Sequence, residues 1–250
     1  MTRPLTTLRI LSWNIHKGVG GVDRRYDLGR VADVLARLEP DLALLQEVAQ
    51  GMPSLRGDDQ VQRLGALDGL FRHAEFHPEH QFRRGGYGNL ILSRYPLHDP
   101  EHLDLTIGVR KKRGLVKTHV VIRHDEHQRT LVVHNMHLGL AGSERARQLQ
   151  RFLESEPFRG IHHSTPIIVG GDLNDLWGGL GPKFLAPAGF QRAGKLENTF
   201  PAMFPLRPLD GLFYRGDMRL IDAGVARDAQ AKAASDHLPI WADFELPVAF

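Results

Sequence analysis

A carboxylate and an amide follow the apolar run 166–169, in the stretch GGDLN at residues 170–174. The run has the length and β-branched content of a buried strand, and the glycines indicate where the chain leaves the sheet. If extended geometry continues, Asp172 and Asn174 point to one face while Leu173 points back into the core. Such a pair suits a site that holds a hard divalent cation, a water molecule and a phosphate oxygen. The same pair is also typical of a turn or helix cap, so other strand ends must supply the partners.

Polar side chains stand at or beside the ends of several other apolar runs in this sequence. In α/β sheets, side chains from neighbouring strand ends converge in one crevice. We therefore expect one functional site that draws on several strand ends. The residues at these ends are Asn14, Glu47, His137, Asp172, Asn174, Asp210, Asp236 and His237.

Not every histidine near a strand end is expected to belong to the site. His237 precedes an apolar run, and an imidazole held by a carboxylate can activate a water or stabilise a phosphoryl oxygen. The adjacent Asp236 points away from it on a strand, so we expect Asp210, from a neighbouring strand, to be its partner. His134 and His137 lie three residues apart and face opposite sides of a strand, so both cannot easily bind one ion. Only His137 is assigned to the site.

The predicted secondary structure brings these residues to one edge. The apolar pattern predicts a strand over 8–16, an amphipathic helix over 24–39 and a strand over 41–47, which form a parallel strand-helix-strand unit. The same order recurs in the second half, from a strand at 129–137 through a helix at 143–156 to the GGDLN strand. Further strands are expected at 71–77, 88–93, 103–109, 114–123, 209–214, 220–226 and 238–244.

Composition limits the class of protein. The chain has 250 residues and 42% hydrophobic residues, enough for a single domain over 1–250 with a large core. It has no apolar stretch near the roughly 20 residues that span a bilayer, and Met1–Pro4 lead into strand-like sequence without a signal-peptide core. The expected location is the cytoplasm. The chain is also expected to be a monomer.

The absence of cysteine restricts the chemistry. With 0 cysteines, the chain has no disulfide, no thiolate metal site and no cysteine nucleophile, so any metal must bind oxygen or imidazole. The net charge of +3 agrees with a phosphate-bearing partner without requiring one.

Seven short motifs, in this order, closely resemble the endonuclease/exonuclease/phosphatase superfamily. They are WNI at 13–15, QE at 46–47, GNLILSR at 88–94, NMHL at 135–138, GDLN at 171–174, LD at 209–210 and SDH at 235–237. The resemblance implies a four-layer α/β/β/α sandwich of the deoxyribonuclease I type, in which two packed mixed β-sheets are flanked by helices. It also implies divalent-metal-dependent hydrolysis of phosphoester bonds.

The resemblance further implies a metal centre. Carried over residue by residue, Glu47 is the main carboxylate ligand of Mg²⁺ or Mn²⁺, and Asn14 and Asp236 complete its surroundings. These donors make a hard, oxygen-rich site.

The same resemblance implies the catalytic groups. Asp172 and Asn174 match residues that orient the attacking water and the scissile phosphate. His237, oriented by Asp210, acts as a base or as a phosphate-stabilising group. His137 matches a second acid or base in the deoxyribonuclease and bacterial sphingomyelinase branches.

The substrate stays open among several classes. A nuclease needs a basic rim, which Arg83, Arg84 and the run 110–113 could supply, although such charge runs also commonly face solvent only. A phospholipid or phosphoinositide hydrolase needs an exposed apolar surface, for which 176–177 and 200–204 are candidates that core packing explains equally well. We expect hydrolysis of a phosphodiester, DNA or RNA among them, with a membrane lipid as the alternative. A non-catalytic module that binds a phosphorylated ligand is the alternative from another class.

Overall fold

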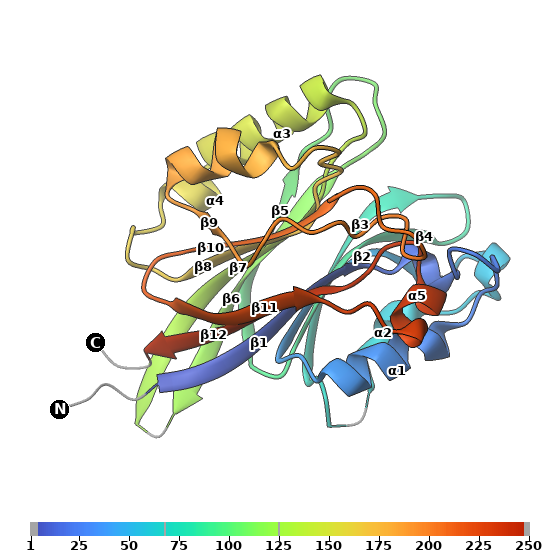
Figure 1. Cartoon of the computed structure of the whole chain (residues 1–250), viewed down its shortest axis with the longest axis horizontal. Helices are drawn as coiled ribbons and strands as arrows, with labels where there is room; N and C mark the ends of the chain where they lie inside the picture. Colours follow the sequence, from blue (N-terminus) through green and yellow to red (C-terminus); the bar gives the residue numbers. More distant parts are fainter. Residues whose placement is uncertain (1–4, 68, 125, 248–250) are drawn as a thin grey trace.

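A computed structural model describes residues 5–67, 69–124 and 126–247 (Figure 1). The segment Met1–Pro4, which was interpreted as lacking a signal peptide, lies outside these ranges. Within them, none of the helices combines the length and the apolar character that a membrane crossing requires.

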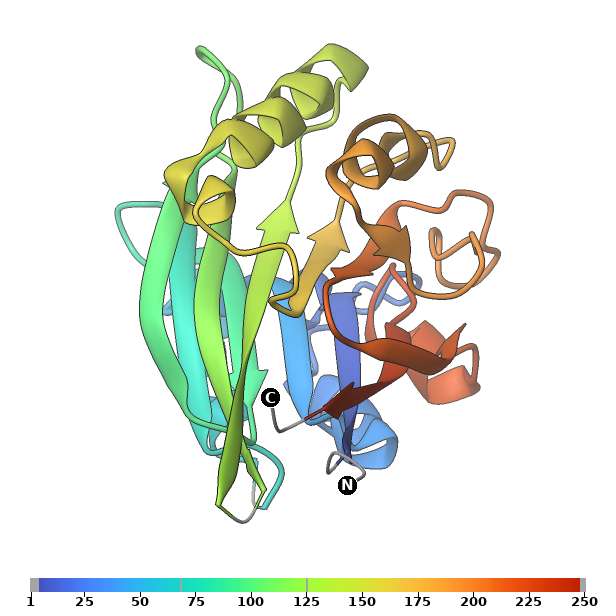
Figure 2. The same cartoon turned by 90° about the vertical axis from the view of Figure 1, so that its left-hand side faces the viewer.

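Two six-stranded sheets pack face to face (Figures 1 and 2). The first sheet contains, in spatial order, β11 (Arg219–Val225), β12 (Ile240–Pro247), β1 (Leu5–Asn14), β2 (Leu42–Gln50), β4 (Gly86–Ser93) and β3 (His73–Gln81). The second contains β5 (Leu97–Asp104), β6 (Gly114–His124), β7 (His127–His137), β8 (Ile167–Asp172), β10 (Asp210–Arg215) and β9 (Gln191–Arg192). Both sheets are mixed, because β1 pairs with β2 and β7 with β8 in parallel while the other pairs are antiparallel.

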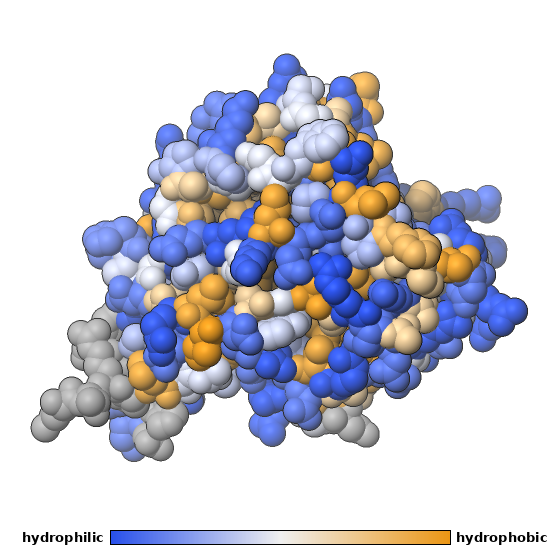
Figure 3. All heavy atoms as spheres, viewed as in Figure 1, coloured by the Kyte–Doolittle hydropathy of each residue, from blue (hydrophilic) through white to orange (hydrophobic). Residues whose placement is uncertain are grey.

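Helices cover the outer face of each sheet (Figure 1). The first sheet carries α1 (Leu28–Leu38), α2 (Gln60–Gly65) and α5 (Ala229–Ala234), and the second carries α3 (Gly142–Glu154) and α4 (Glu156–Arg159). Shorter helical turns are η1 (His16–Gly18), η2 (Pro53–Leu55), η3 (Gly181–Leu185) and η4 (Ala186–Ala188). The expected four-layer α/β/β/α sandwich is confirmed. Its surface is mostly hydrophilic on the face seen in Figure 3, where hydrophobic side chains form separate groups.

The inner strands are buried on both faces, because one face meets the other sheet and one meets the helices. In β1, Leu8 and Ile10 pack in the core between the sheets, whereas Leu11 and Trp13 pack beneath α1. This alternation follows from the two-residue repeat of a strand, and it explains why β1 and β2 appear in the sequence as continuous apolar runs.

A β-bulge interrupts β2 close to its polar end. The pairing with β4 shifts between Leu45 and Val48, so that Gln46 and Glu47 together oppose the single residue Asn89. Glu47 has a φ of 53°, a left-handed conformation that is uncommon for a residue with a side chain. Because bulges re-aim side chains, this irregularity sets the direction of Glu47.

A buried asparagine of the facing sheet is bonded to this bulge. Asn135 in β7 donates from Nδ2 to the carbonyls of Leu45 and Leu90, each at 2.9 Å. Its Oδ1 accepts from Gln46 Nε2 at 2.8 Å. Since buried carbonyls need partners, this one amide stabilises the bulge and joins the two sheets.

The structure corrects two predicted elements and adds one helix that was not predicted. The strand predicted at 103–109 is β5 at Leu97–Asp104, an exposed edge strand whose polar side chains and Pro100 gave no apolar signal. The helix predicted from residue 24 begins at Leu28, after the N-cap Asp27. The short, alanine-rich α5 was not predicted, because six residues do not establish a helical repeat.

We expect the Asn135→Leu substitution to lower the free energy of unfolding by about 3 kcal/mol or more, because two buried carbonyls and one amide lose a partner. Urea denaturation measures the change. Asn198→Leu, at an exposed asparagine, is the matched control and stays within about 0.5 kcal/mol of the native protein. A midpoint for Asn135→Leu as high as that of the control would contradict the bridging role.

Candidate active site

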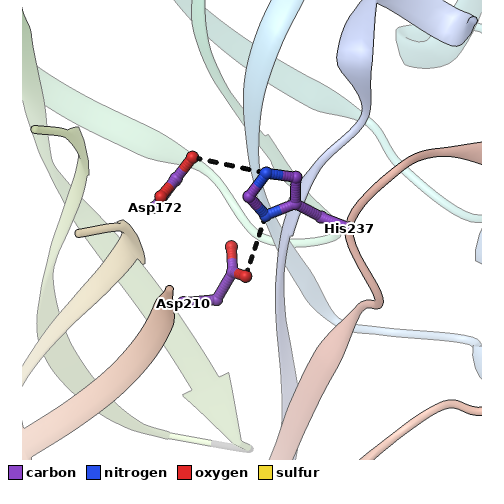
Figure 4. Close-up of side chains that lie close together, drawn as sticks. All are labelled: Asp172, Asp210 and His237. Carbon is purple, nitrogen blue, oxygen red and sulfur yellow. Dashed lines mark hydrogen bonds and ion pairs between the residues drawn. The ribbon is translucent and has the colours of Figure 1, made fainter. Parts of the chain in front are cut away.

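Three of the predicted site residues, Asp172, Asp210 and His237, lie close together (Figure 4). Asp172 is the last residue of β8, where it pairs with His137 of β7 on one side and with Asp210 of β10 on the other. Asn14 reaches it from β1 in the other sheet, through a hydrogen bond of 3.0 Å. The site therefore lies at one end of the sandwich and uses both sheets.

Asp172 is buried but well provided with hydrogen-bond donors. Its Oδ1 accepts from the backbone N–H of Asn174 at 2.9 Å, and its Oδ2 accepts from Nδ2 of Asn14. The Nε2 atoms of His137 and His237 lie 3.4 and 3.8 Å from Oδ2. Burial, together with the nearby Asp210 carboxylate, raises the pKa of Asp172 to about 6. The group is therefore ionised at neutral pH but titrates close to it.

The imidazole of His237 lies between two carboxylates (Figure 4). Its Nδ1 is 2.9 Å from Oδ2 of Asp210, an oxygen that also accepts from the Thr199 hydroxyl. The ring of Phe200 lies 4.9 Å from the imidazole, centre to centre. Burial alone lowers the pKa of His237, but the Asp210 and Asp172 carboxylates raise it to about 10. The structure thus brings Asp210 to His237, and the imidazole is cationic at neutral pH.

His137 lies in the opposite electrostatic environment. Its Nδ1 is 3.4 Å from Nη1 of Arg113, and a guanidinium can only donate, so Nδ1 accepts and the ring proton is on Nε2, facing Asp172. Burial and then the Arg113 charge hold the pKa of His137 well below its ordinary value. The two imidazoles beside Asp172 therefore differ in protonation state.

A second buried carboxylate stands behind Arg113. Glu79 in β3 lies 3.9 Å from Nη1 of Arg113 and accepts hydrogen bonds of 2.8 Å from Nδ2 of Asn89 and the N–H of Gly114. Burial raises the pKa of Glu79 to about 8. The sequence offered Arg113 only as part of the charge run 110–113, either facing solvent or forming a basic rim, and it gave no reason to select Glu79.

Glu47 marks the more open side of the site. Its carboxylate forms an ion pair with Lys17, which sequence reasoning also missed, and Lys111 and His16 add positive charge. Burial opposes ionisation, but the Lys17 ammonium outweighs it and lowers the pKa of Glu47. The side chain of Glu47 is 13% exposed, compared with 2% for Asp172, so the site opens towards Glu47.

The backbone at Asn174 differs from expectation, and Asp236 lies at the edge of the site. The extended geometry does not continue to Asn174: β8 ends at Asp172, and Asn174 is left-handed with a φ of 49°. Its Nδ2 donates to the Leu138 carbonyl at 2.8 Å, so the amide holds the loop that follows β7. The Asp236 carboxylate lies 3.6 Å from Nδ1 of His16, on the partly exposed side of the site.

The donor types fit a hard divalent cation. Glu47 and Asp236 offer carboxylate oxygens and Asn14 an amide oxygen, the ligands that Mg²⁺ and Mn²⁺ prefer. A cation is already attracted here, because the Lys17 ammonium contacts Glu47. Within the described ranges, one compact group could hold an ion with donor atoms less than 4.8 Å apart, and it consists of Asp172, Asp210 and His237. In that group Asp210 and His237 are hydrogen-bonded to each other, which leaves Glu47 as the more available carboxylate.

Comparison with known proteins identifies relatives along nearly the whole chain. The uncharacterized protein YbhP of Escherichia coli K12 is 28% identical, and the match covers 96% of this chain and 97% of YbhP. A crystal structure of an endonuclease/exonuclease/phosphatase from Beutenbergia cavernae superposes with a TM-score of 0.80 at 24% identity, covering 98% of this chain and 72% of that one.

A more distant structure shows the same fold. ANGEL2, a 2′,3′-cyclic phosphatase solved with adenosine-2′,3′-vanadate, superposes with a TM-score of 0.72 at 14% identity, over 99% of both chains. The model of the endonuclease/exonuclease/phosphatase family matches residues 11–237. The chain belongs to the endonuclease/exonuclease/phosphatase family.

Proposed function

We propose that this protein is a divalent-metal-dependent phosphodiester hydrolase, which acts on nucleic acid or another phosphodiester. The observation that carries the proposal is the buried Asp172 carboxylate with an imidazole on either side, His237 bonded to Asp210 and His137 in contact with Arg113. The membership of the chain in a family that includes phosphoesterases such as ANGEL2 supports it.

Asp172 acts as a base and His237 as a cationic hydrogen-bond donor in this proposal. With a pKa of about 6, the Asp172 carboxylate is a suitable base for the attacking water at neutral pH. The His237 imidazolium, held by Asp210, donates a hydrogen bond to a phosphoryl oxygen and stabilises the charge that develops there. Asn174 fixes the loop beside the base.

His137 acts as a neutral donor in this proposal. Because Arg113 occupies Nδ1, the Nε2–H of His137 can bind a phosphoryl oxygen but cannot take a proton. This assignment replaces the second acid or base that the family resemblance implied.

Glu47, Asn14 and, on the exposed side, Asp236 would hold the Mg²⁺ or Mn²⁺ ion. When bound, such an ion neutralises charge on the phosphoryl oxygens and eases departure of the leaving oxygen. Lys17, whose ammonium contacts Glu47, lies where it could also pair with a substrate phosphate.

We expect Asp172→Ala and His237→Ala each to lower the rate of bis-p-nitrophenyl phosphate hydrolysis by roughly 10²-fold to 10⁴-fold, since each removes a group that acts in the transition state. Circular dichroism checks folding, and Asp33→Ala, at an exposed aspartate, is the control. Near-native turnover by either site variant would refute the assignment. Tight binding of inorganic phosphate without any turnover by the native protein would instead support a binding module.

Chelation of divalent ions by EDTA should abolish hydrolysis, and Mg²⁺ or Mn²⁺ should restore it. Because Glu47 is the principal proposed ligand, Glu47→Gln raises the metal concentration for half-maximal activity by roughly 10-fold to 100-fold or more. Glu154→Gln, on the exposed side of α3, leaves it unchanged. Full activity in EDTA would exclude the metal-dependent mechanism.

The pH profile of kcat/KM should be bell-shaped. The rate rises as Asp172 ionises through its pKa of about 6, and it falls as His237 loses its proton through its pKa of about 10. Asp210→Asn removes the charge that raises both values, so both limbs move to lower pH. Thr199→Val removes only a neutral donor to Asp210 and keeps both limbs in place. An alkaline limb that does not move in Asp210→Asn would show that His237 is not the cationic group.

A further inference from the structure

Large apolar side chains are exposed around the active-site end of the sandwich. We call them the apolar rim, and they are Val22, Phe82, Val109, Leu140, Leu176, Trp177, Leu196, Met203, Phe204 and Leu206. Two further exposed apolar residues of the described chain, Leu5 and Ile221, lie on β1 and β11 away from these loops.

The pairing of the strands places the rim at this end. Phe82 lies in the hairpin before Gly86, which pairs with Gln50 at the end of the strand that carries Glu47. Val109 lies in the loop before β6, whose residue Leu115 pairs with Met136 next to His137. The other loops follow directly from β1, β7 and β8 or lead into Asp210. The rim therefore lies on the loops at the active-site end of the sandwich.

These side chains are strongly exposed. Val109 is fully exposed, and Leu140, Trp177 and Phe204 are between 72% and 75% exposed. Single exposed apolar residues are normal, but ten of them on six loops at one end of the sandwich are not. In Figure 3, pale orange side chains gather beside deep blue ones over the loop between β9 and β10.

Exposed basic side chains accompany the rim. Arg83 and Arg84 adjoin Phe82, and Lys111 and Lys112 follow shortly after Val109. The guanidinium of Arg207 stacks on the Trp177 ring at 4.3 Å. Apolar tips with basic neighbours and an amphipathic indole are the combination that binds an anionic lipid interface.

We propose that the apolar rim docks on a lipid bilayer with anionic headgroups and that the hydrolysed phosphodiester is that of a phospholipid. The second part rests on the proposed function. Most of the rim is aliphatic, and Val109, Leu140 and Leu206 have no π-face on which a nucleobase could stack. Such side chains gain free energy by leaving water for the acyl boundary, which brings headgroup phosphodiesters to the mouth of the site.

Co-sedimentation with vesicles tests the docking. The native protein should bind vesicles of phosphatidylglycerol and phosphatidylcholine in equal amounts more tightly than vesicles of phosphatidylcholine alone. The triple variant Val109→Ser, Leu140→Ser, Leu206→Ser should bind roughly 10²-fold more weakly or worse, since each lost side chain costs up to about tenfold. Ile221→Ser, at an exposed apolar residue outside the rim, should bind like the native protein.

The same proteins separate docking from catalysis. The triple variant should hydrolyse the soluble ester bis-p-nitrophenyl phosphate at the native rate, while its release of headgroup from the mixed vesicles falls with binding.

No binding by the native protein, or equal binding by the triple variant, overturns the docking. Binding without lipid hydrolysis, by protein active on the soluble ester, overturns the substrate class. Loss of single-stranded oligonucleotide binding in the triple variant, with vesicle binding intact, assigns the rim to nucleic acid. An inactive native protein overturns the proposed function, and sedimentation still decides the docking.

Discussion

The burial of the Asp172 carboxylate is the constraint on which the rest of the site depends. An ionised carboxylate that is 2% exposed is costly unless charges and donors surround it. The fold supplies them from both sheets: Asn14 from β1, His137 from β7 and His237 from the loop before β12. The separation of the two sheets at this end is therefore coupled to the protonation of the site. Any movement of one sheet against the other changes the pKa of the group proposed as base.

A second constraint acts at β2, where one strand must carry both core side chains and the Glu47 carboxylate of the site. A regular strand would alternate Gln46 and Glu47 between the two packed faces, where a carboxylate has no place. The bulge releases Glu47 from that alternation, and Asn135 supplies hydrogen bonds to Leu45 and Leu90 beside it. The hydrogen bonds that Asn135 makes between the two sheets thus help to fix the position of the Glu47 side chain at the edge of the sandwich.

The parts of this structure that follow from periodicity could be predicted from sequence. Continuous apolar runs identified β1, β2 and β8, and polar residues at their ends identified Asn14, Glu47 and Asp172. Features set by contacts between distant segments could not be predicted. The left-handed turn at Asn174 is held by the carbonyl of Leu138, 36 residues away in the sequence, and the edge strand β5 is too exposed to leave an apolar repeat. The charge run 110–113 was recognised, but only the folded chain brings Arg113 to His137.

The two histidines show why residue type alone does not fix a role. Both imidazoles are buried and both lie near Oδ2 of Asp172, so desolvation disfavours the cation at each. At His237 the second neighbour is the Asp210 carboxylate, which outweighs desolvation. At His137 it is the Arg113 guanidinium, which adds to desolvation. A family motif that aligns both histidines thus leaves their chemistry open. The charge of the group that contacts Nδ1 of each ring determines its protonation state. The Asp210 carboxylate keeps His237 cationic, and the Arg113 guanidinium keeps His137 neutral.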